Sequence, residues 1–378
     1  MTAPQSLVEL TRAGVSIWLD DLDRGRIVSG DLSRLIDDDE VRGVTTNPTI
    51  FAKALSGAGS AYAAQVHELA ESGASVDDAV RALTTTDVRD ACDVFSSLWR
   101  ASDGVDGRVS IEVDPRLARE TSATVLQARL LHGMVDRDNV LIKIPATAEG
   151  LPAITETLAA GISVNVTLIF SIERYAEVID AWMTGLERAH AHGHDLASIQ
   201  SVASFFVSRM DSEVDARLSA IGTPEALCLR GQAGLASARL AWGVFEQAME
   251  SPRWKALEAL GAWKQRPLWA STGVKDPAFP PTMYVMGLVV SGCVNTMPAA
   301  TLDACAAYTG PVIDTVTGTQ AASQAVWDQL TALGISEPEV CQKLEDEGVE
   351  KFDASWAELL QTVQQALDDA RTHHTPGS

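Results

Sequence analysis

Eight short runs of β-branched and apolar residues recur along this chain, and stretches with helical periodicity separate them. The runs predict strands at residues 15–20, 41–46, 108–113, 140–144, 162–167, 201–207, 267–271 and 293–297. Strands that alternate with helices form parallel sheets, and eight such units in a row favour a closed ring over an open sheet. The pattern therefore predicts an α/β fold of the (β/α)8 TIM-barrel type.

Helical periodicity marks most of the connections between these runs. The predicted helices cover Pro115–Met134, Gly150–Ala160, Ser171–Ala191 and Arg209–Ile221. Two connections, 47–107 and 208–266, are longer, and their composition predicts extra helices over Thr49–Leu83 and Pro224–Met249, packed outside the barrel.

The end of the chain predicts one more helix. Within Val349–Asp369, apolar residues recur at helical spacing, namely Phe352, Trp356, Leu359, Leu360 and Val363. We expect this helix to dock back on the barrel, so that residues 1–372 form a single domain. His373–Ser378 is expected to be a disordered tail.

Charge and composition exclude several classes of protein. The formal net charge is −22, which opposes binding to a nucleic-acid backbone. No apolar run reaches the roughly 18 residues that a membrane span needs, and Met1–Leu10 does not resemble a signal peptide, so we expect a cytoplasmic protein. The five cysteines form no CxxC pair, which argues against disulfides and structural zinc.

One predicted strand carries a charged residue in an otherwise apolar run. Lys143 lies in Val-Leu-Ile-Lys-Ile-Pro, where period 2 places it on one face with Leu141 and leaves three apolar residues on the other. Burial of an ammonium group lowers its pKa, and a neutral lysine amine is a nucleophile that forms Schiff bases with carbonyl compounds. The alternative is a strand-end lysine whose stem covers apolar surface while its amine reaches water.

Polar side chains follow most of the other predicted strands. In a parallel barrel these carboxyl ends meet at one mouth, where catalysis takes place. The candidates are Asp20, Asn47, Glu112, Lys143, Asn165, Thr167 and Ser204. Each has a structural alternative as a cap, a turn residue or a hydroxyl bonded to backbone.

Taken together, these residues predict an imine-forming site. Lys143 would add to a ketose carbonyl, and Glu112 or Asp20 would transfer protons. The two amides would bind sugar hydroxyls, and Thr167 would hold a water that relays protons to Glu112. The protonated imine is itself the electron sink, so this chemistry needs no metal or other cofactor.

The later segments supply cations for an anionic substrate. Arg209 follows the sixth strand, and Ser271, Thr272, Gly273 and Lys275 follow the seventh in a small turn that predicts a phosphate cradle. A plain turn with a solvated lysine is the alternative.

Several longer segments carry a family resemblance. They are IWLDDLDR, GVTTNPTIF, VSIEVDPRLARET, VLIKIPATAEGLPAI, GISVNVTLIFS, VASFFVSRMDSEVD, RPLWASTGVKDP, VNTMP and LEDEGVEKFDASWAELL. With these segments the chain closely resembles transaldolases, in particular the long transaldolases of actinobacteria. The resemblance implies an enzyme of the non-oxidative pentose phosphate pathway. Such an enzyme moves a dihydroxyacetone unit from fructose 6-phosphate or sedoheptulose 7-phosphate to glyceraldehyde 3-phosphate or erythrose 4-phosphate.

The resemblance also implies roles for individual residues. The Schiff-base lysine of the family matches Lys143, and its acid/base glutamate matches Glu112. Its second catalytic carboxylate matches Asp20. The donor-binding residues match Asn47, Asn165, Thr167, Ser204 and Phe206, and the phosphate-binding residues match Arg209 and Ser271. We expect small-molecule sugar phosphates as the partners of a monomer or homodimer.

The chain departs from the family pattern in two places. Many shorter relatives carry an arginine shortly after the position of Ser271, whereas here Lys275 is the available cation. Residues 284–293, where similar chains carry a more polar helix, contain Gly287, which would weaken that helix by about 1 kcal/mol.

Three other functions fit part of the pattern. A fructose 6-phosphate aldolase would release dihydroxyacetone to water, and a barrel glycosidase would use Asp20 and Glu112 without the amine of Lys143. The third function is that of a barrel that binds sugar phosphates without turnover.

Overall fold

The computed structural model describes residues 3–57 and 59–372 of the chain. Eight parallel strands pair in sequence order, and the last pairs with the first to close a barrel. They are β1 (Ser16–Leu19), β2 (Val41–Val44), β3 (Arg108–Glu112), β4 (Val140–Pro145), β5 (Val164–Ile169), β6 (Ser201–Phe206), β7 (Arg266–Ala270) and β8 (Val294–Met297). Each predicted run overlaps one of these strands. The predicted (β/α)8 barrel is confirmed.

The predicted alternation of faces is visible in how the strands pack. Val140, Ile142 and Ile144 belong to the large apolar cluster that includes the surrounding helices. Leu141, on the opposite face, belongs to a second cluster together with the barrel residues Trp18, Val202, Leu268 and Val294. Lys143 shares the face of Leu141 and therefore points into the barrel.

A tryptophan of β1, Trp18, is buried in the barrel interior. The indole of Trp18 is fully buried, and its Nε1 donates to Ser16 Oγ at 3.0 Å. On the neighbouring strand, a Cβ atom at Gly43 would lie 2.6 Å from the Trp18 ring, so only glycine leaves room for it.

Helices surround the barrel between the strands. They are α1 (Gln5–Arg12), α2 (Arg24–Val28), α3 (Asp31–Asp38), α8 (Thr121–Val135), α9 (Gly150–Ala159), α10 (Ile172–Ala191), α11 (Ser208–Ile221), α15 (Met283–Met286), α16 (Ala299–Ala306) and α17 (Gln320–Ala332), with a 3-10 turn η2 (Leu196–Ser198). The prediction of one helix over Pro115–Met134 is wrong at its start. A 3-10 turn, η1 (Pro115–Leu117), precedes α8, because the Asp114 carboxylate caps that turn and Glu120 has a non-helical backbone (φ −126°, ψ 83°).

The two long connections contain extra helices, as predicted. The first holds α4 (Pro48–Gly57), α5 (Gly59–Glu71), α6 (Val76–Val94) and α7 (Ser96–Ala101), and the second holds α12 (Pro224–Leu227), α13 (Ala233–Met249) and α14 (Pro252–Ala259).

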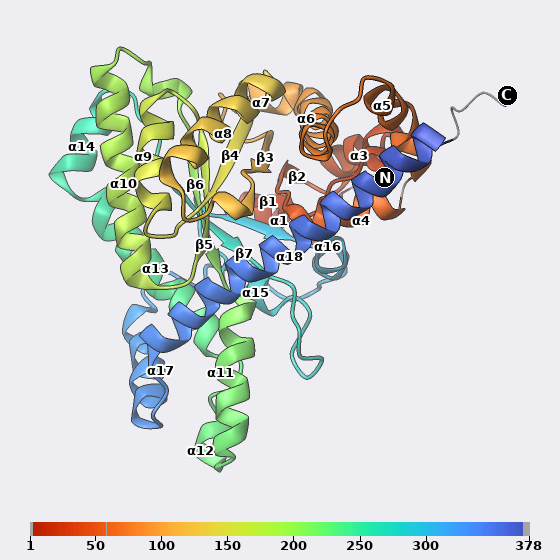
Figure 1. Cartoon of the computed structure of the whole chain (residues 1–378). Helices are drawn as coiled ribbons and strands as arrows, with labels where there is room; N and C mark the ends of the chain where they lie inside the picture. The colour runs from red at the N-terminus through yellow and green to blue at the C-terminus, as the bar shows by residue number, and fades with distance from the viewer. Residues whose placement is uncertain (1–2, 58, 373–378) are drawn as a thin grey trace, which may run out of the picture.

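The terminal helix α18 (Glu337–Thr372) is longer than the predicted Val349–Asp369. Figure 1 shows it in blue as one long helix that runs diagonally past the barrel, and it contacts α11, β5 and α4 on the way. Phe352, Trp356, Leu359 and Val363 are buried, so the predicted docking is confirmed. The predicted tail 373–378 lies outside the described residues, and the single domain over 1–372 stays a prediction.

The segment around Gly287 differs from expectation. The helix α15 is a single turn that ends at Met286, with Gly287 as its C-cap residue, so this glycine does not weaken a helix interior. Its backbone is packed closely: a Cβ atom there would lie 2.7 Å from the Met283 carbonyl oxygen and 2.9 Å from Leu235 Cδ2.

Two class predictions concern disulfides and membranes. All five cysteines are free thiols. Among the described residues, no helix is long and apolar enough to cross a membrane.

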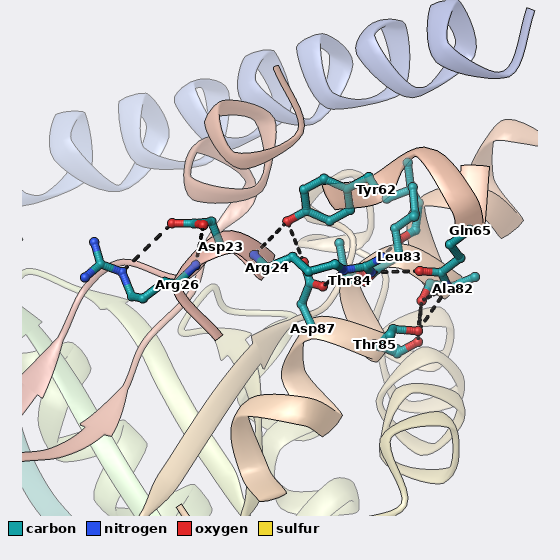
Figure 2. A network of polar contacts seen from close by, with 12 residues as sticks. Asp23, Arg24, Arg26, Tyr62, Gln65, Ala82, Leu83, Thr84, Thr85 and Asp87 are labelled. Atoms are coloured by element: carbon teal, nitrogen blue, oxygen red, sulfur yellow. Dashed lines mark hydrogen bonds and ion pairs between the residues drawn. The ribbon is translucent and has the colours of Figure 1, made fainter. Parts of the chain in front are cut away.

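A buried polar network joins α2 to the extra helices α5 and α6 (Figure 2). Arg24 Nε donates to Asp87 Oδ1 at 2.7 Å, and the Tyr62 hydroxyl donates to Asp87 Oδ2 at 2.7 Å. The Arg24 guanidinium also lies 4.4 Å from the Tyr62 ring centre and donates to Gln65 Oε1. The Asp87 side chain is only 1% exposed, so the network is a desolvated ion pair with its hydrogen bonds satisfied.

Replacing Asp87 by alanine is expected to lower the free energy of unfolding by about 3–5 kcal/mol, because Arg24 would stay buried without its counterion. Asp93 offers a matched control, since it forms an exposed pair with Arg137 and its removal should cost about 0–1 kcal/mol. Urea unfolding of both variants measures the difference. An equal loss in the free energy of unfolding of the two variants would contradict the claim that the buried ion pair contributes more than the exposed one.

Candidate active site

The carboxyl ends of the strands surround a cavity of about 550 Å³. Nine of the eleven predicted site residues line it: Asp20, Asn47, Lys143, Thr167, Ser204, Phe206, Arg209, Ser271 and Lys275. The other two, Glu112 and Asn165, lie behind this lining and hydrogen-bond to lining residues. The fold thus brings all eleven together, although they come from seven different strand ends and the segments after them.

Strand register places the lysine beside a carboxylate. Glu112 pairs with Lys143 across β3 and β4, and Lys143 pairs with Asn165 across β4 and β5, so the three side chains form a row on the inner face. Lys143 Nζ lies 3.4 Å from Glu112 Oε2 and donates to the Thr46 carbonyl oxygen at 3.2 Å. Its side chain is 6% exposed, so the alternative of an amine extended into water is wrong.

Glu112 has the properties of a proton-transfer group. Burial raises its pKa to about 7, and the nearby ammonium of Lys143 opposes part of this rise. A pKa raised toward neutrality suits a carboxyl group that both donates and accepts a proton.

Sequence reasoning missed two threonines near Asp20, of which one bonds to Asp20 and the other bonds to the first. Asp20 Oδ1 accepts a hydrogen bond from Thr45 Oγ1 at 2.7 Å, and Thr45 Oγ1 lies 2.6 Å from Thr296 Oγ1. Both threonines belong to segments that carried the family resemblance, which was the available signal. Asn47 has its structural role as well, since its Oδ1 accepts from the Ile50 backbone N–H at 3.0 Å near the start of α4.

A chain of hydrogen bonds runs from Ser204 to Ser110. Ser204 Oγ donates to Asn165 Oδ1 at 2.7 Å, and Asn165 Nδ2 donates to Ser110 Oγ at 3.0 Å. Asn165 is fully buried, so in this structure its amide orients Ser204 and does not face the cavity.

Thr167 differs from these neighbours. Its hydroxyl is buried at the cavity wall and has no hydrogen-bond partner among the described residues. A buried hydroxyl without a partner is a place for an ordered water, which agrees with the predicted relay. The next residue, Leu168, has a left-handed backbone (φ 58°), and the β5–β6 register shifts there.

Arg209 supplies a half-buried guanidinium to the site. Its guanidinium lies 5.0 Å from the Phe206 ring centre, and its Nη1 has no hydrogen-bond partner among the described residues. Burial lowers the pKa of this guanidinium, while Glu112 and Asp20 oppose the shift. A desolvated guanidinium with a free donor is suited to an oxyanion such as phosphate.

The turn after β7 supplies the rest of the predicted cradle, with one correction. Ser271 has a left-handed backbone (φ 56°) and its Oγ lies 2.9 Å from Ser208 Oγ, while Lys275 is exposed at the cavity rim. Thr272 points away, because its hydroxyl donates to the Thr296 carbonyl oxygen at 2.8 Å. Thr272 therefore does not offer its side chain to a ligand.

Sequence reasoning also missed cations on α4 and α18. Lys53 and Lys351 line the cavity together with Lys143 and Lys275. The chain has three further lysines, Lys255, Lys264 and Lys343. With Arg209, the four lysines at the cavity give the lining five cations against three carboxylates, Asp20, Glu213 and Glu347. In a chain of net charge −22, this local excess of positive charge favours an anionic ligand in this cavity.

No group of three or more His, Cys, Asp or Glu side chains suited to a metal ion occurs within residues 3–57 and 59–372.

The geometry defines a class of protein: a parallel (β/α)8 barrel enzyme with a buried lysine and carboxylate at its catalytic mouth. Comparison with known proteins then identifies the family. The model of the transaldolase/fructose-6-phosphate aldolase family matches residues 17–363, and the chain belongs to this family.

Individual relatives match over nearly the whole chain. A transaldolase of Mycolicibacterium smegmatis is 57% identical over 371 residues, and one of Kocuria rhizophila is 59% identical over 371 residues. A transaldolase of Mycobacterium tuberculosis is 58% identical over 372 residues. Each alignment covers 98% of this chain and 100% of the relative.

Proposed function

We propose that this protein is a transaldolase that transfers a dihydroxyacetone unit between sugar phosphates through a Schiff base on Lys143. The observation that carries the proposal is the Lys143–Glu112 pair, buried in the barrel at the wall of a cation-lined cavity. A glycosidase would have no use for this amine, and the full-length relatives are named transaldolases.

Each step of the reaction has a group within the site. The neutral amine of Lys143 adds to the ketose carbonyl, and Glu112 protonates the departing hydroxyl as the carbinolamine loses water. Asp20 accepts the proton of the hydroxyl on the fourth carbon while the bond between the third and fourth carbons breaks. The aldose phosphate leaves, and the dihydroxyacetone unit stays on Lys143 until an acceptor aldehyde takes it by the reverse steps.

Substrate binding follows from the remaining residues. Asn47, Ser204 and Phe206 line the part of the cavity that holds the sugar, with Asn165 behind them, and Thr167 holds the relay water. Arg209, Ser271 and Lys275 bind the phosphate. The substrates are fructose 6-phosphate or sedoheptulose 7-phosphate as donors and glyceraldehyde 3-phosphate or erythrose 4-phosphate as acceptors, in the non-oxidative pentose phosphate pathway. A cytoplasmic location and a monomeric or homodimeric state stay predictions.

Borohydride trapping tests the proposal. Incubation with fructose 6-phosphate and borohydride is expected to leave a reduced three-carbon adduct on Lys143, mapped by peptide mass spectrometry, because reduction fixes the imine. An active protein with an unmodified Lys143 would reject the mechanism.

Fructose 6-phosphate aldolase activity is the second candidate, since the matched family includes it. Consumption of fructose 6-phosphate with and without erythrose 4-phosphate separates the two activities. A transaldolase depends on the acceptor, whereas an aldolase releases dihydroxyacetone at the same rate without it.

A further inference from the structure

The terminal helix α18 places an aromatic ring over the reacting amine. Phe352 is 5% exposed, and Lys143 Nζ lies over its ring at 5.7 Å from the ring centre. The Arg209 guanidinium lies 5.9 Å from the same ring centre. Phe352 lines the catalytic cavity, so it has a place in the site beyond the helix docking that its spacing predicted.

Contacts before and after Phe352, on the same face of α18, hold this ring in position. One turn before Phe352, a Cβ atom at Gly348 would lie 3.1 Å from Leu168 Cδ2 and 3.5 Å from Arg209 Nη1, so the missing side chain lets α18 approach the barrel closely. Less than one turn after Phe352, Ser355 Oγ lies 2.7 Å from Thr49 Oγ1 on α4. Packing on both sides of Phe352 along α18 therefore fixes its ring at the mouth of the barrel.

The lysine nitrogen has fewer N–H donors as a protonated imine than as an ammonium, although both forms are positively charged. As an ammonium the nitrogen has three N–H donors, of which the Thr46 carbonyl and Glu112 accept two. As a protonated imine it has one N–H, so at least one of these hydrogen bonds is lost while the positive charge remains. The negative face of an aromatic ring within about 6 Å stabilises such a cation without a hydrogen bond.

We propose that Phe352 is a positioning residue of the Schiff-base step, whose ring face stabilises the positive charge on the imine nitrogen of Lys143. This inference rests on the proposed function, since it concerns the same imine. If Phe352 has this role, the terminal helix α18 contributes a residue that affects how much imine forms on Lys143.

The test compares an aromatic side chain at position 352 with an aliphatic one. Phe352→Leu keeps an apolar side chain without a ring, and Phe352→Tyr keeps the ring. The measurement is the concentration of dihydroxyacetone that gives half-maximal borohydride trapping on Lys143. This ketone carries no phosphate, so a loss of phosphate binding by Arg209 does not affect the result. We expect Phe352→Leu to raise this concentration about 10-fold, within the range for a desolvated cation–π contact. Phe352→Tyr should stay within about two-fold of the parent protein.

Trp356 provides a matched control on the same helix. Its ring lies 5.9 Å from the Arg116 guanidinium, and it does not line the cavity. Trp356→Leu removes an aromatic ring and a cation–π contact from α18, so it should destabilise the helix docking similarly while leaving the trapping concentration unchanged.

If Phe352→Leu does not fold, a substitution that keeps the shape of the ring tests the same role. Difluorophenylalanine at position 352 has a weaker negative face and nearly the same shape, and it should raise the half-maximal concentration about two- to five-fold. If the parent protein is trapped on Lys143 and neither the leucine variant nor the fluorinated ring changes the concentration, the role of Phe352 is refuted and the proposed function stands. An active parent protein without any adduct on Lys143 would instead refute the proposed function.

Discussion

Replacing Lys143 by methionine is expected to lower kcat for dihydroxyacetone transfer by about four orders of magnitude or more, the scale on which enzymes lose activity without their covalent nucleophile. Methionine has a similar length and fits an apolar environment, so the barrel interior around Leu141 should keep its packing. The variant should also give no borohydride adduct. Coupled assays of erythrose 4-phosphate consumption and intact-protein mass spectrometry measure both effects.

Lys255 is the control for this substitution. It lies on α14 at the surface, with 51% of its side chain exposed, and Lys255→Met should leave kcat unchanged. Full turnover in Lys143→Met would contradict the imine mechanism and would favour chemistry that uses Asp20 and Glu112 alone.

Replacing Glu112 by glutamine is expected to lower kcat by about 10²- to 10⁴-fold, because an amide of the same shape cannot take up or release the proton. Since burial raises the pKa of Glu112 to about 7 in the ligand-free protein, the parent enzyme should show a limb near neutrality in its pH profile of kcat/KM, which reports groups of the free enzyme. That limb should disappear in the variant. A profile that keeps the limb would assign it to another group.

The same pKa predicts how folding stability depends on pH. The folded-state pKa of Glu112 lies above its ordinary value, so the native state binds the proton more tightly than the unfolded state. Its contribution to stability is complete below about pH 4 and is lost as the pH rises through about 7. Between these values the parent protein should lose stability relative to Glu112→Gln. Thermal unfolding of both proteins at pH 5 and pH 8 measures this difference.

The sequence predicted the barrel because its signals are local. A run of apolar residues with period 2, followed by a helical pattern, determines strand, helix and the face of each residue without knowledge of the neighbours. Lys143 could therefore be placed on the inner face with Leu141 from four residues of sequence. The polar residues at the strand ends could be grouped because parallel strands in a barrel share one mouth.

Boundaries and side-chain partners needed more than local signals. The chain over Pro115–Met134 reads as one helix, yet the Asp114 cap separates a short 3-10 turn from α8. The turn after the seventh strand predicted both Ser271 and Thr272 for the phosphate cradle, although the resemblance matched only Ser271. Of the two, only Ser271 lines the cavity, because the Thr272 hydroxyl donates to the carbonyl oxygen of Thr296.

By itself, the sequence determined the eight strands, the inward face of Lys143 and the set of polar groups at the strand ends, since these depend on neighbours within a few residues. Tertiary structure alone decided that Glu112 and Lys143 are register partners 3.4 Å apart and that Phe352 lies over the same amine. Both contacts join residues distant along the chain. They depend on strand register and on the path of α18 across the barrel, which arise from packing of the whole molecule.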